Sequence, residues 1–352
     1  MDFSLTEDQR ALRTGMRTLM ERRFPRAALR AVVDAEGEAA VDRSLWRELG
    51  AAGFFALRLP EAAGGVGLGL PEAVLAFEEA GRALLPGPLV TTHLAAGPSA
   101  AGFSAAGAAE GEAVVTGLDA PGALGASGVS VVTQGTGGVL VEHLASADAV
   151  LVLGAEDAEV CPAKEVMPSA EAIRSVDPAT PLHRVRGGGV RNGLRSGGWS
   201  SRGRGIAARL RREAALLTAA QQLGSAARTV EMAVAHAGGR VQFGRAIGAF
   251  QAVQHLCASM LVRAETARSV VYAAAITEDP GDIAAATLLA DEAAIRNARD
   301  CLQVHGGMGF TWEADVHLHL KRAWVRAEQW QTVAAAEEEL AARLMSTGAP
   351  CL

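Results

Sequence analysis

Aromatic residues are scarce in this chain. Its 352 residues include five Trp, nine Phe and a single Tyr. A core made mainly of Ala, Leu and Val suits closely packed helices better than a large β-sandwich, which depends on aromatic and β-branched side chains. The chain also lacks an apolar run near the about 20 residues that a membrane helix needs, so we expect no membrane span. The sequence thus predicts a globular, mainly helical protein.

A surplus of positive charge is also missing. The chain holds 33 Lys and Arg against 39 Asp and Glu, a formal net charge of −6. Nucleic-acid-binding proteins neutralise phosphates with a basic surface, so this balance argues against nucleic acid as a partner. The four cysteines form no CxxC pair, which argues against a zinc ribbon or a disulfide framework. We therefore expect no metal site, and we expect a cytoplasmic location because the N-terminal segment is acidic and unlike a signal peptide.

Residues 1–112 are predicted to form an N-terminal helical domain. Thr6 stands before two acidic residues as an N-cap, and apolar residues then recur at helical spacing. Further helices are predicted near 42–52 and 70–85, and Pro86-Gly87-Pro88 is expected to stop the second of them.

The character of the sequence changes after residue 112. A small β domain is predicted at 113–186, because short β-branched runs alternate there with glycine-rich turns; the runs lie at 113–116, 129–132 and 149–153. A Gly/Arg/Ser-rich linker is predicted at 187–205. Helical periodicity returns at 206–352 and predicts a four-helix bundle. A long helix is expected from residue 206, and further helices, with breaks, at about 250–275, 283–304 and 314–345.

Several short motifs in this order resemble those of one enzyme family. The segment Gly239 to Gln251, which reads GRVQFGRAIGAFQ, and the segment Gln303 to Thr311, which reads QVHGGMGFT, resemble two hallmarks of the C-terminal bundle of acyl-CoA dehydrogenases. Residues 57–68 and 3–7 resemble that family's N-terminal domain. The resemblance implies an α+β, acyl-CoA dehydrogenase-like fold in a shortened, divergent member of the family.

The resemblance also implies FAD as the cofactor and names the residues that would bind it. Arg240 would face the diphosphate across a subunit interface, since an Arg fork matches phosphate oxygens in pairs. The glycines of the second motif would let bare backbone approach the dinucleotide. The implied cofactor-binding residues are Arg240, Gln242, Phe243, Gln251, Gln303, Gly306, Gly307, Gly309 and Thr332. Structural alternatives exist for each: Arg240 as a helix cap, the two glutamines 242 and 251 as surface amides, and Gly306-Gly307 as an ordinary helix stop.

The catalytic base departs from the family pattern. Counted without gaps from Gly306-Gly307, the family's glutamate position falls on Trp330, and an indole takes no proton from carbon. Glu328 is the nearest carboxylate and the first candidate, with a solvent-exposed helix residue as the structural alternative. Some members carry the base on the first bundle helix, where Ala214 stands here with Glu213 beside it; Glu213 would face elsewhere and pair with a neighbour such as Arg209.

The predicted function is FAD-dependent α,β-dehydrogenation of an acyl thioester, with an electron-transferring flavoprotein as acceptor of the electrons. Two alternatives stay open. In the first alternative, the chain is a non-catalytic or half-site subunit of a heteromeric dehydrogenase. In the second, it uses the same fold for a non-redox reaction on a carrier-bound acyl group. A homo-oligomer or a hetero-oligomer with a second dehydrogenase-like subunit is expected, because the resembled family shares its flavin sites between subunits.

Overall fold

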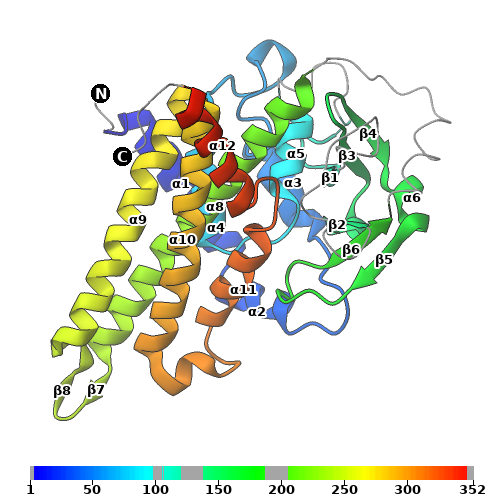
Figure 1. Cartoon of the computed structure of the whole chain (residues 1–352). Helices are drawn as coiled ribbons and strands as arrows, with labels where there is room; N and C mark the ends of the chain where they lie inside the picture. The colour runs from blue at the N-terminus through cyan, green and yellow to red at the C-terminus, as the bar shows by residue number, and fades with distance from the viewer. Residues whose placement is uncertain (1–3, 98–104, 106, 120–137, 187–204, 347–352) are drawn as a thin grey trace. The chain divides into compact units, whose positions relative to one another are not determined.

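The computed structural model describes residues 4–97, 105, 107–119, 138–186 and 205–346, and Figure 1 shows the order of the elements. The chain divides into two compact units that alternate along the sequence. One comprises Met1–Phe24, Val74–Leu85 and Ala215–Leu352, and the other comprises Pro25–Ala73 and Pro86–Ala214. The boundaries at residues 112, 186 and 205 that the sequence suggested stay predictions.

The unit formed by Pro25–Ala73 and Pro86–Ala214 carries short helices. The helix predicted near 42–52 is confirmed as α3, and its cap was not predicted: the carboxylate of Asp42 accepts hydrogen bonds from the backbone N–H groups of Ser44 and Leu45. The helices and 3-10 turns of this unit are α2 (Arg26–Val33), α3 (Arg43–Ala51), η1 (Glu61–Ala63), α5 (Leu89–Ala96), η4 (Leu144–Ser146), α6 (Ala163–Val166) and η5 (Met167–Ser169).

The same unit contains two small β-sheets. In the first, β1 (Val115–Asp119) pairs in parallel with β3 (Ala149–Leu153), and β3 pairs antiparallel with β4 (Ala158–Pro162). The second is antiparallel, in the order β2 (Gly138–Glu142), β6 (Leu182–Arg186) and β5 (Ala170–Ile173). The hydrophobic cluster of this β region is built from aliphatic or small side chains, as the composition led us to expect: Leu118, Val141, Leu144, Val150, Val152, Cys161, Ala163, Val166 and Val185.

The strand predictions have a mixed outcome. The run at 149–153 is confirmed as β3, and the run at 113–116 is shifted, because β1 begins at Val115 and continues to Asp119. The run at 129–132 lies outside the described residues. Strands β2, β4, β5 and β6 were not predicted, because their four or five residues mix apolar with charged side chains and, apart from residues 139–141 of β2, show no continuous apolar run.

The other unit opens with α1 (Glu7–Arg23), and its N-cap prediction is confirmed. The Thr6 hydroxyl accepts a hydrogen bond from the backbone N–H of Gln9 at 3.2 Å, and the Gln9 side chain accepts one from the backbone N–H of Thr6 at 3.1 Å. This reciprocal capping box satisfies two of the donors that a helix start leaves free.

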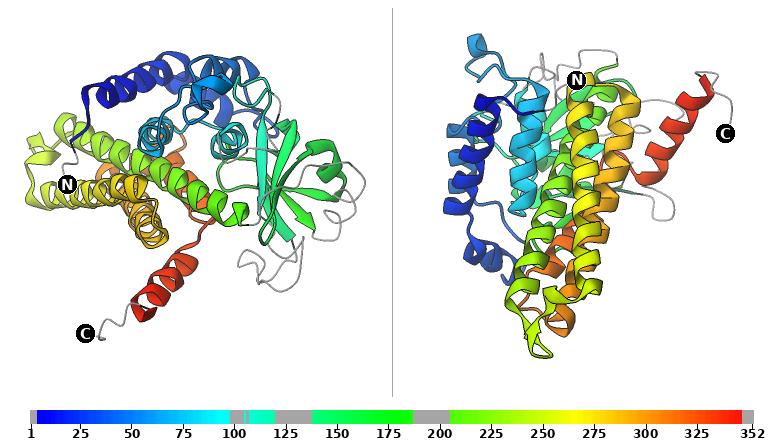
Figure 2. Two further views of the ribbon diagram at one scale, coloured as in Figure 1. Left: turned by 90° about the horizontal axis from the view of Figure 1, so that it is seen from above. Right: turned by 90° about the vertical axis from the view of Figure 1, so that its left-hand side faces the viewer.

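The helical bundle follows in the same unit. Its helix α10 packs against α9, α11 and α12, and Figure 2 shows α9 and α10 side by side. No described helix is long and apolar enough to cross a membrane. The elements are the main part of α8 (Ile206–Gly239), then β7 (Val241–Gln242), β8 (Arg245–Ala246), η6 (Ile247–Ala249), α9 (Gln251–Thr277), α10 (Pro280–His305), η7 (Gly306–Phe310), α11 (Val316–Arg326) and α12 (Val333–Ser346).

Two predicted helix ends are corrected. Helix α4 (Leu70–Arg82) ends three residues before the predicted Leu85, because Leu84 adopts a positive φ of 53° and Leu85 N–H bonds back to the Ala80 carbonyl at 3.0 Å. This is a Schellman-type end, which stops the helix before the prolines are reached. Helix α10 starts at Pro280 rather than near Ile283, since Asp279 caps it and proline fits the first helical position.

Helices α4 and α8 approach each other closely where each carries a glycine. A Cβ on Gly224 of α8 would overlap the backbone carbonyl of Glu78, and one on Gly81 of α4 would overlap the backbone carbonyl of Gln221. Glycine is therefore required at this crossing, because any side chain would push the two helices apart.

We expect Gly224→Ala to lower the free energy of unfolding by about 2–4 kcal/mol, since overpacking a backbone contact forces the helices to move. Urea unfolding followed by circular dichroism measures this loss. Gly238→Ala on the same helix is the matched control, because a Cβ there meets nothing within 4 Å. That control should gain up to about 1 kcal/mol from helix propensity. Equal stability of the two variants would contradict the close approach.

Candidate functional site

The first family-like motif forms a small hairpin after α8. Strands β7 and β8 are joined by Phe243 and Gly244, whose φ angles are +54° and +77°. Two positive φ values in a two-residue loop define the tight turn preferred in β-hairpins, at a cost in strain for the non-glycine residue. The Phe243 side chain is 91% exposed. The tight turn of the hairpin therefore holds a large apolar side chain, that of Phe243, in contact with solvent.

Contacts within the hairpin fix its base. The guanidinium of Arg245 lies 4.2 Å from the centre of the Phe250 ring, and Phe243 meets the same ring edge-on at 6.1 Å between centroids. Ile247 N–H bonds to the Arg240 carbonyl at 2.8 Å. These contacts use the aromatic rings and the Arg240 backbone but leave the Arg240 guanidinium without a hydrogen bond or ion pair within the described residues. A cationic fork is thus available for a ligand.

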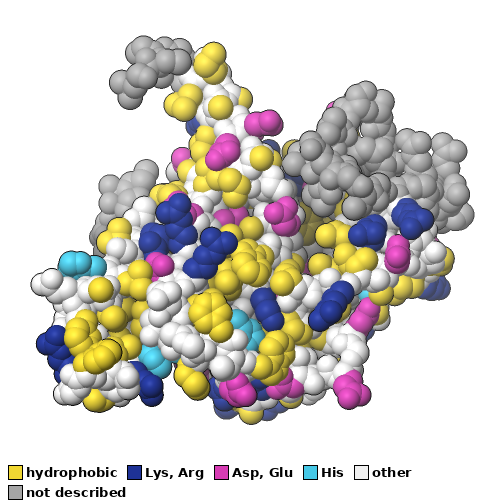
Figure 3. Space-filling model, turned by 60° about the horizontal axis from the view of Figure 1, so that its bottom comes forward, with side chains coloured by type: hydrophobic (Ala, Val, Ile, Leu, Met, Phe, Trp, Pro, Cys, Tyr) yellow, Lys and Arg dark blue, Asp and Glu magenta, His cyan; other side chains and the backbone are white. Residues whose placement is uncertain are grey.

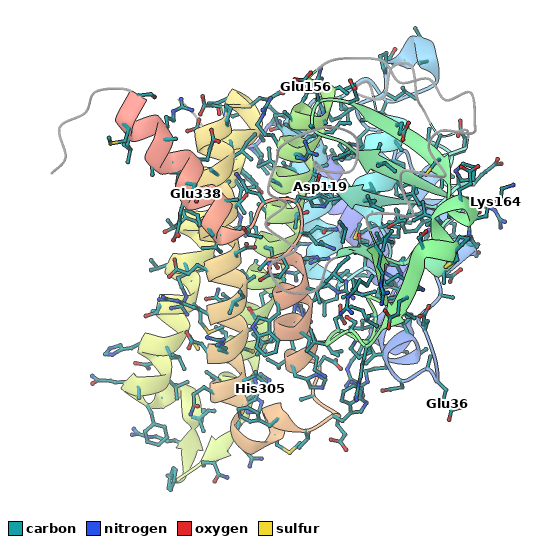
Figure 4. The ribbon with its side chains drawn as sticks, turned by 45° about the vertical axis from the view of Figure 1, so that its right-hand side comes forward. Glu36, Asp119, Glu156, Lys164, His305 and Glu338 are labelled. Carbon is teal, nitrogen blue, oxygen red and sulfur yellow. The ribbon has the colours of Figure 1, made fainter. Side chains whose placement is uncertain are left out.

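The second motif lies next to the first. His305 ends α10, and its ring stacks on that of His236 in the last turn of α8, with 4.1 Å between centroids. Figure 4 shows His305 at the end of α10 beside the β7–β8 hairpin. Two motifs that are about sixty residues apart in the sequence therefore meet at one end of the bundle.

The turn after α10 is open to an incoming group. Gly306 has φ +60° and ψ −144°, a conformation reserved for glycine, and a Cβ on Gly306 or Gly307 would meet nothing within 4 Å. Gly309 differs, because a Cβ there would lie 2.9 Å from the Leu302 carbonyl oxygen. The turn thus offers bare backbone at 306–307 and close packing at 309.

The end of the bundle that carries these motifs combines apolar and basic side chains. Figure 3 shows hydrophobic side chains among Lys and Arg at the lower left of that view. Five large hydrophobic side chains of the hairpin and of η7 with its flanking residues are exposed: Val241, Phe243, Met308, Phe310 and Trp312. An exposed group of this kind marks an interaction surface.

The structure places most predicted cofactor residues at this end of the bundle. Gln242 and Gln303 are exposed, and Gln251 is the first residue of α9, directly after Phe250. Thr332 lies elsewhere, in the connection between α11 and α12, where its hydroxyl accepts a hydrogen bond from Ala335 N–H at 3.3 Å. The assignment of these residues to a cofactor stays a prediction.

The connection between α11 and α12 also carries the candidate base. Glu328 is exposed, two residues after the end of α11. Trp330 has φ +59°, and Gln331 N–H bonds to the Gln329 carbonyl at 2.7 Å. This combination is the strained form of the γ-turn, and strain of this kind concentrates at functional sites. Gln331 is anchored by the Thr287 hydroxyl of α10 at 3.2 Å.

The second candidate base has a partner that the sequence did not indicate. Glu213 forms a buried ion pair with Arg58, which is 155 residues away in the sequence. Both side chains are more than nine-tenths buried. A carboxylate held in this way has little freedom to act as a base, so Glu328 remains the better candidate.

Sequence reasoning missed a buried acid next to this connection. Asp291 of α10 is 3% exposed, and its Oδ1 accepts a hydrogen bond of 2.8 Å from the Gln222 side-chain amide, which also donates to the Ala323 carbonyl at 3.0 Å. Within the described residues, Asp291 Oδ2 and Gln222 Oε1 have no hydrogen-bond partner. Helical periodicity could have revealed this acid, because Asp291 lies on the alanine-rich, buried face of α10.

Burial raises the pKa of Asp291 to about 7, the Gln222 hydrogen bond opposes this shift, and the charge of Glu328 adds to it. Because the folded-state pKa lies above the unfolded value of about 3.9, the folded chain holds this proton more tightly. Stability from this group is therefore complete below about pH 4 and is lost as the pH rises toward 7.

We expect Asp291→Asn to remove that loss, because an amide does not ionise. The stability of the variant relative to the native chain should rise by up to about 4 kcal/mol between pH 4 and pH 8. Urea unfolding at several pH values tests this, with exposed Glu292→Gln on the same helix as control. Parallel stability curves for the native chain and Asp291→Asn would show that Asp291 is ionised in the fold.

Comparison with known proteins decides the family. The model for the acyl-CoA dehydrogenase N-terminal domain matches residues 6–110, and the model for the acyl-CoA dehydrogenase C-terminal domain matches residues 202–330. The chain is 33% identical over 326 residues to acyl-CoA dehydrogenase IpdE2 of Mycobacterium tuberculosis, covering 90% of this chain and 91% of that protein. The chain belongs to the acyl-CoA dehydrogenase family.

Solved structures agree with this assignment. The ChsE4–ChsE5 complex of Mycobacterium tuberculosis matches with a TM-score of 0.77 and 25% identity over all of both chains. A Tcur3481–Tcur3483 steroid acyl-CoA dehydrogenase (ACAD) variant matches with a TM-score of 0.78 and 26% identity over 98% of this chain and 99% of that chain. The predicted fold class is confirmed: this acyl-CoA dehydrogenase has helical N- and C-terminal parts and a small β region.

Family membership also confirms the predicted reaction class and cofactor. The protein is an oxidoreductase, a flavoenzyme of the acyl-CoA dehydrogenase type that uses FAD on an acyl thioester. The described residues fit the diphosphate of that cofactor, since the Arg240 fork has no partner among them and the backbone at 306–307 is open. Which residues bind FAD in this chain is a separate question.

Proposed function

We propose that this acyl-CoA dehydrogenase holds FAD at an interface between subunits, with the β7–β8 hairpin and the 303–309 turn facing the cofactor. The observation that carries the proposal is the meeting of the two motifs at one end of the bundle, where the Arg240 guanidinium has no partner among the described residues. The exposure of Phe243 supports a role for the hairpin toward a neighbouring subunit, because an isolated chain gains nothing from a 91% exposed Phe.

Each residue of the proposed site has a distinct task. Arg240 would bind phosphate oxygens in pairs, Gln242 and Gln303 would donate side-chain N–H groups, and Gly306, Gly307 and Gly309 would allow backbone to approach. Phe243 would cover an apolar part of the cofactor and exclude water. Gln251 and Thr332 are the remaining proposed contacts. When bound, FAD would supply the acceptor for the hydride that leaves the β-carbon of the acyl group.

Proton removal is the task that we assign to Glu328. The α-proton of a thioester needs a carboxylate within reach of the α-carbon, and Glu328 is the exposed carboxylate closest in sequence to the family position at Trp330. The γ-turn at Trp330 holds this connection in one conformation, which would fix the position of the base.

A second candidate function is favoured by one observation, the tryptophan at the base position. In this reading the chain is a half-site subunit that lends Arg240 and its neighbours to the flavin of a different dehydrogenase-like subunit. Structural relatives that are complexes of two named chains support this reading. One of them is a steroid ACAD, so thioesters with bulky ring systems belong among the first substrates to test.

The absorbance spectrum of the purified chain, alone and co-purified with a second dehydrogenase-like subunit, tests the proposal. We expect flavin absorbance that bleaches when a suitable acyl-CoA is added. A protein that binds no FAD in either preparation would contradict it. We further propose that an electron-transferring flavoprotein reoxidises the flavin, and that the reaction belongs to acyl-CoA metabolism in the cytoplasm.

A further inference from the structure

Two histidines stack face to face where the two motifs meet. His236 in the last turn of α8 and His305 at the end of α10 have ring centroids 4.1 Å apart and planes inclined by 24°. Both residues are half-buried. Arg240 stands one helical turn after His236, since its backbone N–H bonds to the His236 carbonyl at 2.9 Å. The pair and the arginine therefore form one cationic surface when the imidazoles are protonated.

Hydrogen bonding fixes which atom of His305 takes up a proton. Its Nδ1 lies 2.8 Å from the Cys301 carbonyl oxygen, and because a carbonyl only accepts, Nδ1 carries the hydrogen. Nε2 is then the basic atom. Cys301 Sγ is 3.6 Å from the same Nδ1, but burial raises the pKa of the Cys301 thiol to about 12, so this thiol carries no charge.

Neighbouring groups disfavour protonation of His236 in the free chain. Burial lowers the pKa of His236, and the neighbouring His305 and Arg240 lower it further. Burial raises the pKa of the Cys257 thiol of α9 as well. Asp300 is paired with Arg263 and does not offset the positive charge.

We propose that His236 and His305 extend the Arg240 surface into a site for the diphosphate of an adenosine-diphosphate-containing cofactor, and that the pair is protonated when this anion binds. The inference rests on the proposed function, because it takes Arg240 as the primary phosphate contact. Two imidazolium rings 4.1 Å apart repel each other and the guanidinium, and a diphosphate bound beside the rings offsets that cost with its negative charge.

Binding should therefore strengthen as the pH falls. We expect the affinity of the purified protein for FAD to rise about fivefold between pH 8 and pH 6, the size of one added charge-assisted contact. ADP and coenzyme A, which also carry an adenosine diphosphate group, are tested in parallel by calorimetry, and their titrations are compared with those of the double histidine variant because their terminal phosphates gain a proton in this pH range. A pH-dependent gain for FAD and ADP assigns the surface to the flavin cofactor, whereas a gain for coenzyme A alone assigns it to the acyl carrier.

Variants distinguish the contribution of the two histidines to cofactor binding from that of Arg240. His236→Gln and His305→Gln should each reduce the pH dependence, because one imidazole remains in each variant, and the double variant should abolish it. His255→Gln, an exposed histidine of α9, is the control and should behave as the native chain. NMR titration of the histidine rings gives a readout independent of activity: the ring signals that His236→Gln and His305→Gln remove should shift to higher pKa when ADP is added.

The outcomes distinguish this inference from the proposed function. Loss of binding in Arg240→Ala, together with unchanged pH dependence in both histidine variants, would overturn the inference and leave the proposed function standing. No binding of FAD or ADP by the native protein between pH 6 and pH 8 would overturn both.

Discussion

Arg240→Ala is expected to weaken FAD binding at least about 100-fold in the assembled protein. A bidentate contact between a guanidinium and phosphate oxygens contributes roughly 3 kcal/mol, and alanine provides no substitute donor. Flavin absorbance per protein and calorimetric titration of the apoprotein measure the effect. The FAD affinity of Arg240→Lys should lie between those of the native protein and Arg240→Ala, because an ammonium binds phosphate as a point charge without the paired geometry.

The matched control is Arg296→Ala on the exposed surface of α10, which removes the same charge from the same unit. Arg296 pairs with Glu292 one turn away, and such surface pairs contribute little. The fold should be unchanged in Arg240→Ala, since the guanidinium has no partner among the described residues. If both arginine variants bind FAD like the native protein, the hairpin does not face the cofactor.

Glu328→Gln is expected to slow flavin reduction by an acyl-CoA roughly 10²- to 10⁴-fold, the usual contribution of a general base. The amide has nearly the same shape but cannot accept the α-proton. Stopped-flow bleaching of the flavin measures the rate of this step directly. Glu338→Gln, an exposed residue of α12 labelled in Figure 4, is the control for removing one negative charge.

Trp330→Glu tests the register of the base in the same assay. Introduced into the Glu328→Gln variant, it places a carboxylate at the family position and should recover part of the lost rate. If Glu328→Gln reduces its flavin as fast as the native protein, proton removal belongs to another residue. Activity that then appears only with a second subunit would establish the half-site role.

The local signals of the sequence were sufficient for several elements. Thr6 caps α1 as predicted, the helix predicted near 42–52 is α3, and the run at 149–153 is β3 without correction. These features depend on neighbouring residues: a side-chain oxygen beside free N–H groups, or consecutive β-branched side chains. The end of α4 was missed because its backbone turns at Leu84, and nothing in a leucine marks a positive φ.

Contacts between residues far apart in the sequence could not be predicted in the same way. The sequence did not indicate that Glu213 pairs with Arg58, 155 residues away. In the sequence, Asp291 is one more charged residue of an alanine-rich helix. Packing makes it a buried acid, beside the Gln222 side-chain amide of α8, which also bonds to the Ala323 carbonyl of α11. Helix packing determines these environments, and a single sequence does not encode it locally.

By itself, the sequence determined the family, the reaction class and the residues that carry the two motifs, because motif identity and order are properties of the chain. The tertiary structure decided that these motifs meet. It brings the end of α8 against the end of α10, so that His236 stacks on His305 beside the Arg240 hairpin. The reason is geometric: each helix fixes only its own length and cap, and the packing of their apolar faces decides which ends lie together.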